Sequence, residues 1–126
     1  MTNPNRNKLK APFELILRGN GISIEETEYM FAHATVGRKW KFDYAWPSHR
    51  VAVELEGGVW VGKGHAAPVR FIGDCEKYNR ASLDGWMLLR YTVTDINKSP
   101  GRIVEELREA LGKGGLYVQA KESKEG

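Results

Sequence analysis

The chain has 126 residues, which is the length of one domain with a single hydrophobic core. Hydrophobic residues make up 41% of it, and this share indicates a packed globule. No stretch approaches the roughly 18 consecutive apolar residues of a membrane span, and the N-terminal residues lack the apolar core of a secretory signal. The one cysteine, Cys75, excludes an internal disulfide and cannot build a zinc cluster alone. We therefore expect a single cytoplasmic domain over residues 1–126, with no membrane partner.

The charge balance is mildly basic, with a formal net charge of +3 at pH 7 and a pI near 9.0. Such an excess suits a polyanionic partner such as DNA. Many ordinary soluble domains carry the same excess, so the charge alone does not distinguish between these classes of protein.

Hydrophobic spacing and turn residues predict alternating helices and strands between two flexible tails, residues 1–7 and 113–126. This alternation predicts an α/β fold, in which a mixed sheet with a central β-hairpin is flanked by helices. The expected elements, in chain order, are a helix at 9–17, a weak strand at 28–33, strands at 39–46 and 51–56, a helix at 72–83, a strand at 86–92 and a helix at 103–111.

The two strongest strands alternate between apolar and polar residues, so the side chains of each are expected to divide between two faces. A four-residue turn, residues 47–50, joins them and sets their register. The register places every apolar pair on one face and two acids opposite each other on the other face: Trp46 with Val51, Tyr44 with Val53, Phe42 with Leu55, and Asp43 with Glu54.

Facing carboxylates destabilise a hairpin unless a cation lies between them. Oxygen ligands of this kind suit Mg²⁺ (magnesium), with Mn²⁺ as a substitute, better than zinc. Glu56 lies one step along the same face and either extends this site or pairs with Lys41. If the face is exposed to solvent, all of these residues are simply its polar surface.

The small side chains of Ala45 and Ala52 on the same face favour a covered site instead. Alanine pairs indicate that a helix packs there, and buried carboxylates then require a metal or a proton partner.

Several segments, taken in order, resemble the PD-(D/E)XK superfamily of nucleases, and within it small phage and bacterial proteins related to the very-short-patch mismatch endonucleases. The resemblance spans about residues 14–110 and implies a restriction-endonuclease-like fold. The segments that carry it are FDYAWP (42–47), VAVELEGG (51–58), His65, DCEKYN (74–79) and GWMLLRYT (85–92).

The resemblance implies a metal-binding role for Asp43 and Glu54, with the Leu55 carbonyl as a third ligand and Glu14 as a further acid of the metal shell. Many members have lysine where this chain has Glu56, so another group must assist the attacking water. The resemblance assigns this role to His65, and Lys77 on the following helix is the competing candidate.

The expected function is Mg²⁺-dependent endonucleolytic hydrolysis of DNA, in which the ion activates water and neutralises charge on the phosphate. Four basic residues are expected either to hold DNA phosphates or to form a solvated rim: Arg38, Lys39, Lys63 and Arg70. Two alternatives stay open: a non-catalytic DNA-binding or assembly module of the same fold, and a branched-DNA (Holliday junction) resolvase. The second would need a homodimer.

Overall fold

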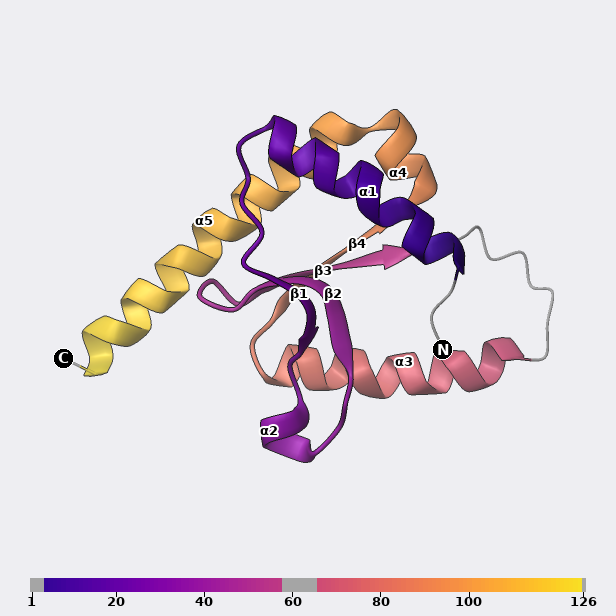
Figure 1. Cartoon of the computed structure of the whole chain (residues 1–126). Helices are drawn as coiled ribbons and strands as arrows, with labels where there is room; N and C mark the ends of the chain where they lie inside the picture. Colours follow the sequence, from indigo (N-terminus) through magenta and orange to yellow (C-terminus); the bar gives the residue numbers. More distant parts are fainter. Residues whose placement is uncertain (1–3, 58–65, 126) are drawn as a thin grey trace.

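The computed structural model describes the backbone of residues 4–57 and 66–125 and the side chains of residues 6–57 and 72–113. Its centre is a four-stranded mixed sheet in the order β1-β2-β3-β4, with helices on both faces (Figure 1), which confirms the predicted α/β class. The first three strands are antiparallel neighbours, and β4 runs parallel to β3. The strands are β1 (Glu26–Met30), β2 (Lys41–Trp46), β3 (Val51–Glu56) and β4 (Met87–Thr92).

The helices divide between the two faces of the sheet. In Figure 1, α1 (Pro4–Gly19), α4 (Val93–Lys98) and α5 (Pro100–Glu125) lie on one side, and α2 (His33–Val36) and α3 (Ala66–Leu83) lie on the other. None of the described helices combines the length and the apolar composition that crossing a bilayer requires.

Each face of the sheet has its own hydrophobic core. On the α1 side, Phe13 and Leu17 of α1 pack with Tyr44, Val53 and further strand residues, together with buried residues of α4 and α5. On the α3 side the core is smaller and contains Phe31, Phe42, Ala45, Ala52, Ala81 and Trp86.

The small pair Ala45 and Ala52 lies opposite each other across the hairpin, and both residues are fully buried. They share their core with Ala81 of α3. This confirms the expectation that a helix covers the polar face of the hairpin, because two alanines leave room for a helix to approach the sheet.

The hairpin register is confirmed for Tyr44 with Val53 and for Trp46 with Val51. The position of Phe42 was predicted wrongly. Phe42 packs in the α3-side core, where its ring stacks on Phe31 with centroids 4.0 Å apart. The alternation is therefore interrupted at Asp43, between two aromatic residues that belong to different cores.

The backbone of the neighbouring strand, β1, is also irregular at this point. The β1–β2 pairing includes Thr27 with Tyr44 and Tyr29 with Phe42 but omits Glu28, whose φ of 49° lies in the left-handed region. A non-glycine residue rarely adopts this conformation, and in a strand it breaks the regular pleat.

Several element bounds differ from the sequence prediction. Strand β1 begins at Glu26, helix α3 begins at Ala66, and α5 continues to Glu125, beyond the glycines at 112, 114 and 115 that favoured an earlier end. Helix α4 was not predicted, although its first turn carries a capping box. The Thr92 side chain accepts from the Asp95 backbone N–H, and Asp95 accepts from the Thr92 backbone N–H.

Candidate functional site

Asp43 and Glu54 are the buried charged residues of the described part of the chain, with exposed fractions of 4% and 1%. They belong to adjacent strands, β2 and β3, in the half of the hairpin that lies away from its turn. An ionised carboxylate cannot be removed from water at low cost without a partner. The partners of this pair therefore determine what the site can do.

Asp43 lies where the strand pairing stops. Its Oδ2 accepts a hydrogen bond of 2.7 Å from the backbone N–H of Leu55. The backbone pairing of β2 with β3 extends from the turn as far as Tyr44 with Val53, so the carboxylate satisfies a backbone donor of β3 just beyond this pair. The aspartate thus holds the two strands together as well as carrying charge.

Arg6 of α1 bridges the two acids. Its Nε donates to Asp43 Oδ2 at 2.9 Å, and its Nη2 lies 2.8 Å from the same oxygen and also donates to Glu54 Oε2. Lys77 of α3 approaches from the other side of the sheet, and its Nζ donates to Glu54 Oε1. We call Arg6, Asp43, Glu54 and Lys77 the charge cluster.

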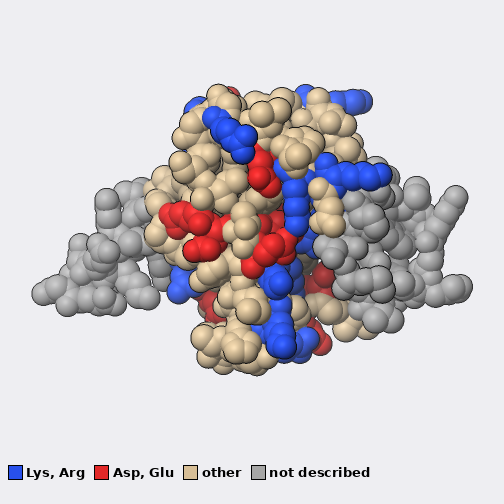
Figure 2. Space-filling view, in the orientation of Figure 1, with Lys and Arg blue, Asp and Glu red and all other residues tan. Residues whose placement is uncertain are grey.

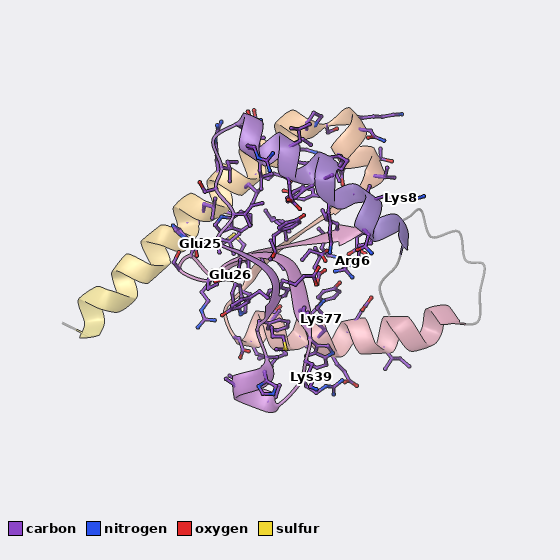
Figure 3. The ribbon with its side chains drawn as sticks, viewed as in Figure 1. Arg6, Lys8, Glu25, Glu26, Lys39 and Lys77 are labelled. Atoms are coloured by element: carbon purple, nitrogen blue, oxygen red, sulfur yellow. The ribbon has the colours of Figure 1, made fainter. Side chains whose placement is uncertain are left out.

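Figure 3 shows Arg6 and Lys77 in the space between α1 and α3, where the two helices converge on the sheet from opposite faces. With both acids ionised the cluster has no net charge. The cation that facing carboxylates were expected to need is therefore supplied, in this structure, by protein side chains.

The electrostatics of the cluster are dominated by burial. Burial raises the pKa of the Glu54 carboxyl from its ordinary 4.5 to about 7, and the negative charge of Asp43 acts in the same direction. Lys77 and Arg6 oppose this shift without cancelling it. For Arg6, burial lowers the pKa of the guanidinium, but the charges of Glu54 and Asp43 outweigh burial and raise it overall.

Glu56 lies outside the charge cluster. It is half-buried, and its Oε1 accepts a 2.7 Å hydrogen bond from Nε of Arg90 on β4. The guanidinium of Arg90 lies 4.4 Å from the centroid of the Tyr78 ring. The alternative in which Glu56 pairs with Lys41 is therefore wrong, and its partner Arg90 is exposed at the surface.

Glu14 is engaged elsewhere as well. Its Oε2 accepts a 2.6 Å hydrogen bond from the Tyr44 hydroxyl, on the α1 side of the sheet. It also lines an open pocket together with Arg18 and residues 21–24. Within the described side chains, no three His, Cys, Asp or Glu residues gather closely enough to hold a metal ion, so Glu14 does not join the two buried acids here.

The predicted DNA-contacting residues are only partly described. Arg38 and Lys39 are exposed on the segment before β2, where the Arg38 guanidinium lies 4.1 Å from the centroid of the Trp40 ring. His65 and Lys63 lie outside the described residues, and Arg70 lies in α3 with its side chain outside them.

Arg6 is the site residue that the sequence prediction missed, because residues 1–7 were taken as a tail. A signal was present, since Arg6 precedes Leu9 by three residues and Phe13 by seven, which places it on the buried face of α1. An arginine on such a face needs acceptors, and the two acids provide them.

The donor chemistry of Asp43 and Glu54 fits a hard divalent cation. Mg²⁺ is commonly held by one or two carboxylates, with water and substrate phosphate as its other ligands. Both side chains offer oxygen only, and they converge on one cation, Arg6. The Arg6 guanidinium would have to move before an ion could bind the same oxygens.

The substitution Asp43→Asn should destabilise the domain by about 1–3 kcal/mol, since it weakens charge-assisted hydrogen bonds to a buried carboxylate. Urea unfolding without metal measures this effect. Glu109→Gln, which neutralises an exposed acid on α5, is the matched control and should change stability little. An Asp43 variant as stable as wild type would mean that the carboxylates repel each other more than Arg6 stabilises them.

The raised pKa of Glu54 predicts a pH dependence of stability. Since the folded state holds this proton up to about pH 7 and the unfolded state loses it near 4.5, the stability contributed by the proton is complete below 4.5 and disappears as the pH rises through 7. Unfolding between about pH 5 and about pH 8 should therefore show a decline in wild type that Glu54→Gln lacks. Equal pH profiles of the two proteins would contradict the assignment of this pH dependence to the Glu54 carboxyl.

The sequence is similar to two proteins of Mycobacterium tuberculosis, Uncharacterized protein MT2308 of strain CDC 1551 / Oshkosh and Uncharacterized protein Rv2248 of strain H37Rv. Each is 27% identical to this chain over 105 residues, which cover 83% of the chain. The chain spans 37% of the length of these relatives, and their names assign no activity. No family model and no solved structure matches the chain.

Proposed function

We propose that this chain is a Mg²⁺-dependent endonuclease that hydrolyses phosphodiester bonds in DNA, with its active site at Asp43 and Glu54. One observation carries the proposal: two buried carboxylates on adjacent strands converge on Arg6 of α1, while Lys77 of α3 contacts one of them. The resemblance to the PD-(D/E)XK superfamily assigns these two acids to the metal.

Keeping two acids at this position is costly for the fold. Desolvation of a buried ion costs several kcal/mol, and apolar residues of similar volume often serve stability equally well. Acids retained at such a cost, with one pKa strongly perturbed, are characteristic of functional sites.

In the proposed reaction Asp43 and Glu54 would hold the ion. Mg²⁺ bound there would lower the pKa of a water and would offset negative charge on the phosphate. The Leu55 N–H fixes one oxygen of Asp43, so the carboxylate is oriented by the strand backbone. With a pKa near 7, Glu54 is increasingly ionised above neutral pH, which favours metal binding there.

Many members of the superfamily carry a lysine at the position of Glu56, and we assign the role of that lysine to Lys77. Its ammonium contacts Glu54 and lies 5.9 Å from the centroid of the Phe42 ring and 5.7 Å from that of Tyr78, so it is held beside the acids with 12% of its side chain exposed. A cation at this place can stabilise the attacked phosphate or assist the attacking water. This contact supports Lys77 as the assisting group.

Basic residues on both sides of the charge cluster support DNA as the substrate. In Figure 3, Lys8 lies beyond Arg6 on α1, and Lys39 lies beyond Lys77 before β2. Figure 2 shows acidic side chains gathered near the centre of this face and basic side chains bordering them. A DNA strand whose phosphate reaches the acids would meet positive charge on both sides.

A non-catalytic DNA-binding module is the second candidate, and a specific observation favours it. Arg6 and Lys77 already neutralise both acids, as the members of a purely structural ion network would. A Holliday junction resolvase would use the same site in a homodimer, and its preference for branched DNA distinguishes it from a simple endonuclease.

Plasmid nicking with and without Mg²⁺ tests the endonuclease. We expect nicking that requires the ion, disappears in Asp43→Asn and falls about 10²-fold or more in Lys77→Met. The matched control is Lys98→Met, which removes an exposed lysine of α4 and should leave the rate unchanged. A synthetic four-way junction cut faster than linear duplex would favour the resolvase.

DNA bound by the wild type without Mg²⁺-dependent cleavage would instead support the binding module. A His65→Ala variant that is inactive beside an active Lys77→Met variant would return the assisting role to the histidine.

DNA affinity should fall steeply with salt, because lysines that contact phosphates release counterions on binding. Replacing both Lys8 and Lys39 by alanine should reduce the slope of log K against log salt by about 1.8, while Lys98→Ala should leave it unchanged. Fluorescence anisotropy between about 50 and about 200 mM salt measures this slope. Equal slopes for all three proteins would remove these lysines from the DNA-binding surface.

A further inference from the structure

Arg6 uses the same carboxylate oxygens that a metal ion would need. Its guanidinium binds Asp43 through Oδ2 and Glu54 through Oε2, and these two acids are its partners among the described residues. An ion coordinated by both acids through these oxygens cannot coexist with the guanidinium between them.

Lys77 is placed differently. It contacts Glu54 through the other oxygen, Oε1, so its contact does not occupy the Oδ2–Oε2 position. It is also less exposed than Arg6, 12% against 28% of the side chain, and lies near the rings of Phe42 and Tyr78. Of the two cations, Arg6 is the one that can leave while the other stays.

We propose that Arg6 is an exchangeable counter-cation, which keeps the empty site neutral and is expelled when a divalent metal binds Asp43 and Glu54. The inference rests on the proposed function and extends it by naming a residue that sets metal affinity. Arg6 lies in the first turn of α1, so its side chain can swing away without disturbing Phe13 and Leu17, which hold the rest of the helix in the core.

The charges agree with such an exchange. With both acids ionised, the cluster with Arg6 and Lys77 has a net charge of zero. Replacing the guanidinium by a divalent ion raises the net charge to +1, which matches the single negative charge of a phosphodiester. An ion that bound without expelling Arg6 would leave +2 at a site that is largely removed from water.

The test measures Mn²⁺ binding by titration calorimetry to the full chain, with no DNA present. We expect Arg6→Gln to bind Mn²⁺ about tenfold more tightly than wild type, because the ion no longer has to displace a bound cation. Lys8→Gln removes the same charge from the exposed side of the same helix and should change the affinity by less than about twofold.

The conservative variant Arg6→Lys serves if Arg6→Gln does not fold. It keeps the charge but loses the planar fork that binds both acids, so its Mn²⁺ affinity should also exceed that of wild type. Equal or weaker Mn²⁺ binding by the Arg6 variants, relative to Lys8→Gln, would overturn the proposal.

The outcomes also separate this proposal from the proposed function. Tighter Mn²⁺ binding in the Arg6 variants that Asp43→Asn abolishes, without plasmid nicking by the wild type, would support the exchange and reject the endonuclease. Mg²⁺-dependent nicking by the wild type, with unchanged Mn²⁺ affinity in the Arg6 variants, would reject the exchange alone.

Discussion

Two carboxylates buried on adjacent strands need cations close to them, and the arrangement of this domain satisfies that need from both faces of its sheet. Arg6 reaches Asp43 and Glu54 from α1, and Lys77 reaches Glu54 from α3. Two helices that belong to different hydrophobic cores thereby meet at one cluster of charges. The same contacts make the cluster sensitive to pH and to competing cations.

The sequence predicted the centre of the fold because its signals there are local. Strand alternation and a four-residue turn sufficed for the pairs Tyr44 with Val53 and Trp46 with Val51, and the Ala45–Ala52 pair indicated the covering helix. Phe42 was misplaced because strict alternation assumes a regular pleat. On the neighbouring strand, Glu28 is left out of the pairing opposite this point and has a left-handed backbone, and no feature of an ordinary glutamate signals this.

The candidate site was also predicted from the sequence only in part. The register places Asp43 beside Glu54, so a short-range argument found the two acids, whereas Arg6 contacts them across 37 and 48 residues of chain. The sequence prediction also placed Glu14 and Glu56 at or near the metal site because they are acids, without knowledge of their hydrogen-bond partners. Glu14 is bonded to Tyr44 and Glu56 to Arg90, and both partners come from other elements. Long-range partner choice is decided by packing, which composition and spacing do not encode.

The central claim is that Asp43 and Glu54 form a site for a divalent metal. Its most direct test is a crystal of the protein soaked in Mn²⁺, with diffraction recorded at a wavelength where manganese scatters anomalously. We predict an anomalous peak in contact with both carboxylates and the Arg6 side chain withdrawn from between them. Crystals saturated with Mn²⁺ that show no such peak, with Arg6 still bridging the two acids, would contradict the account.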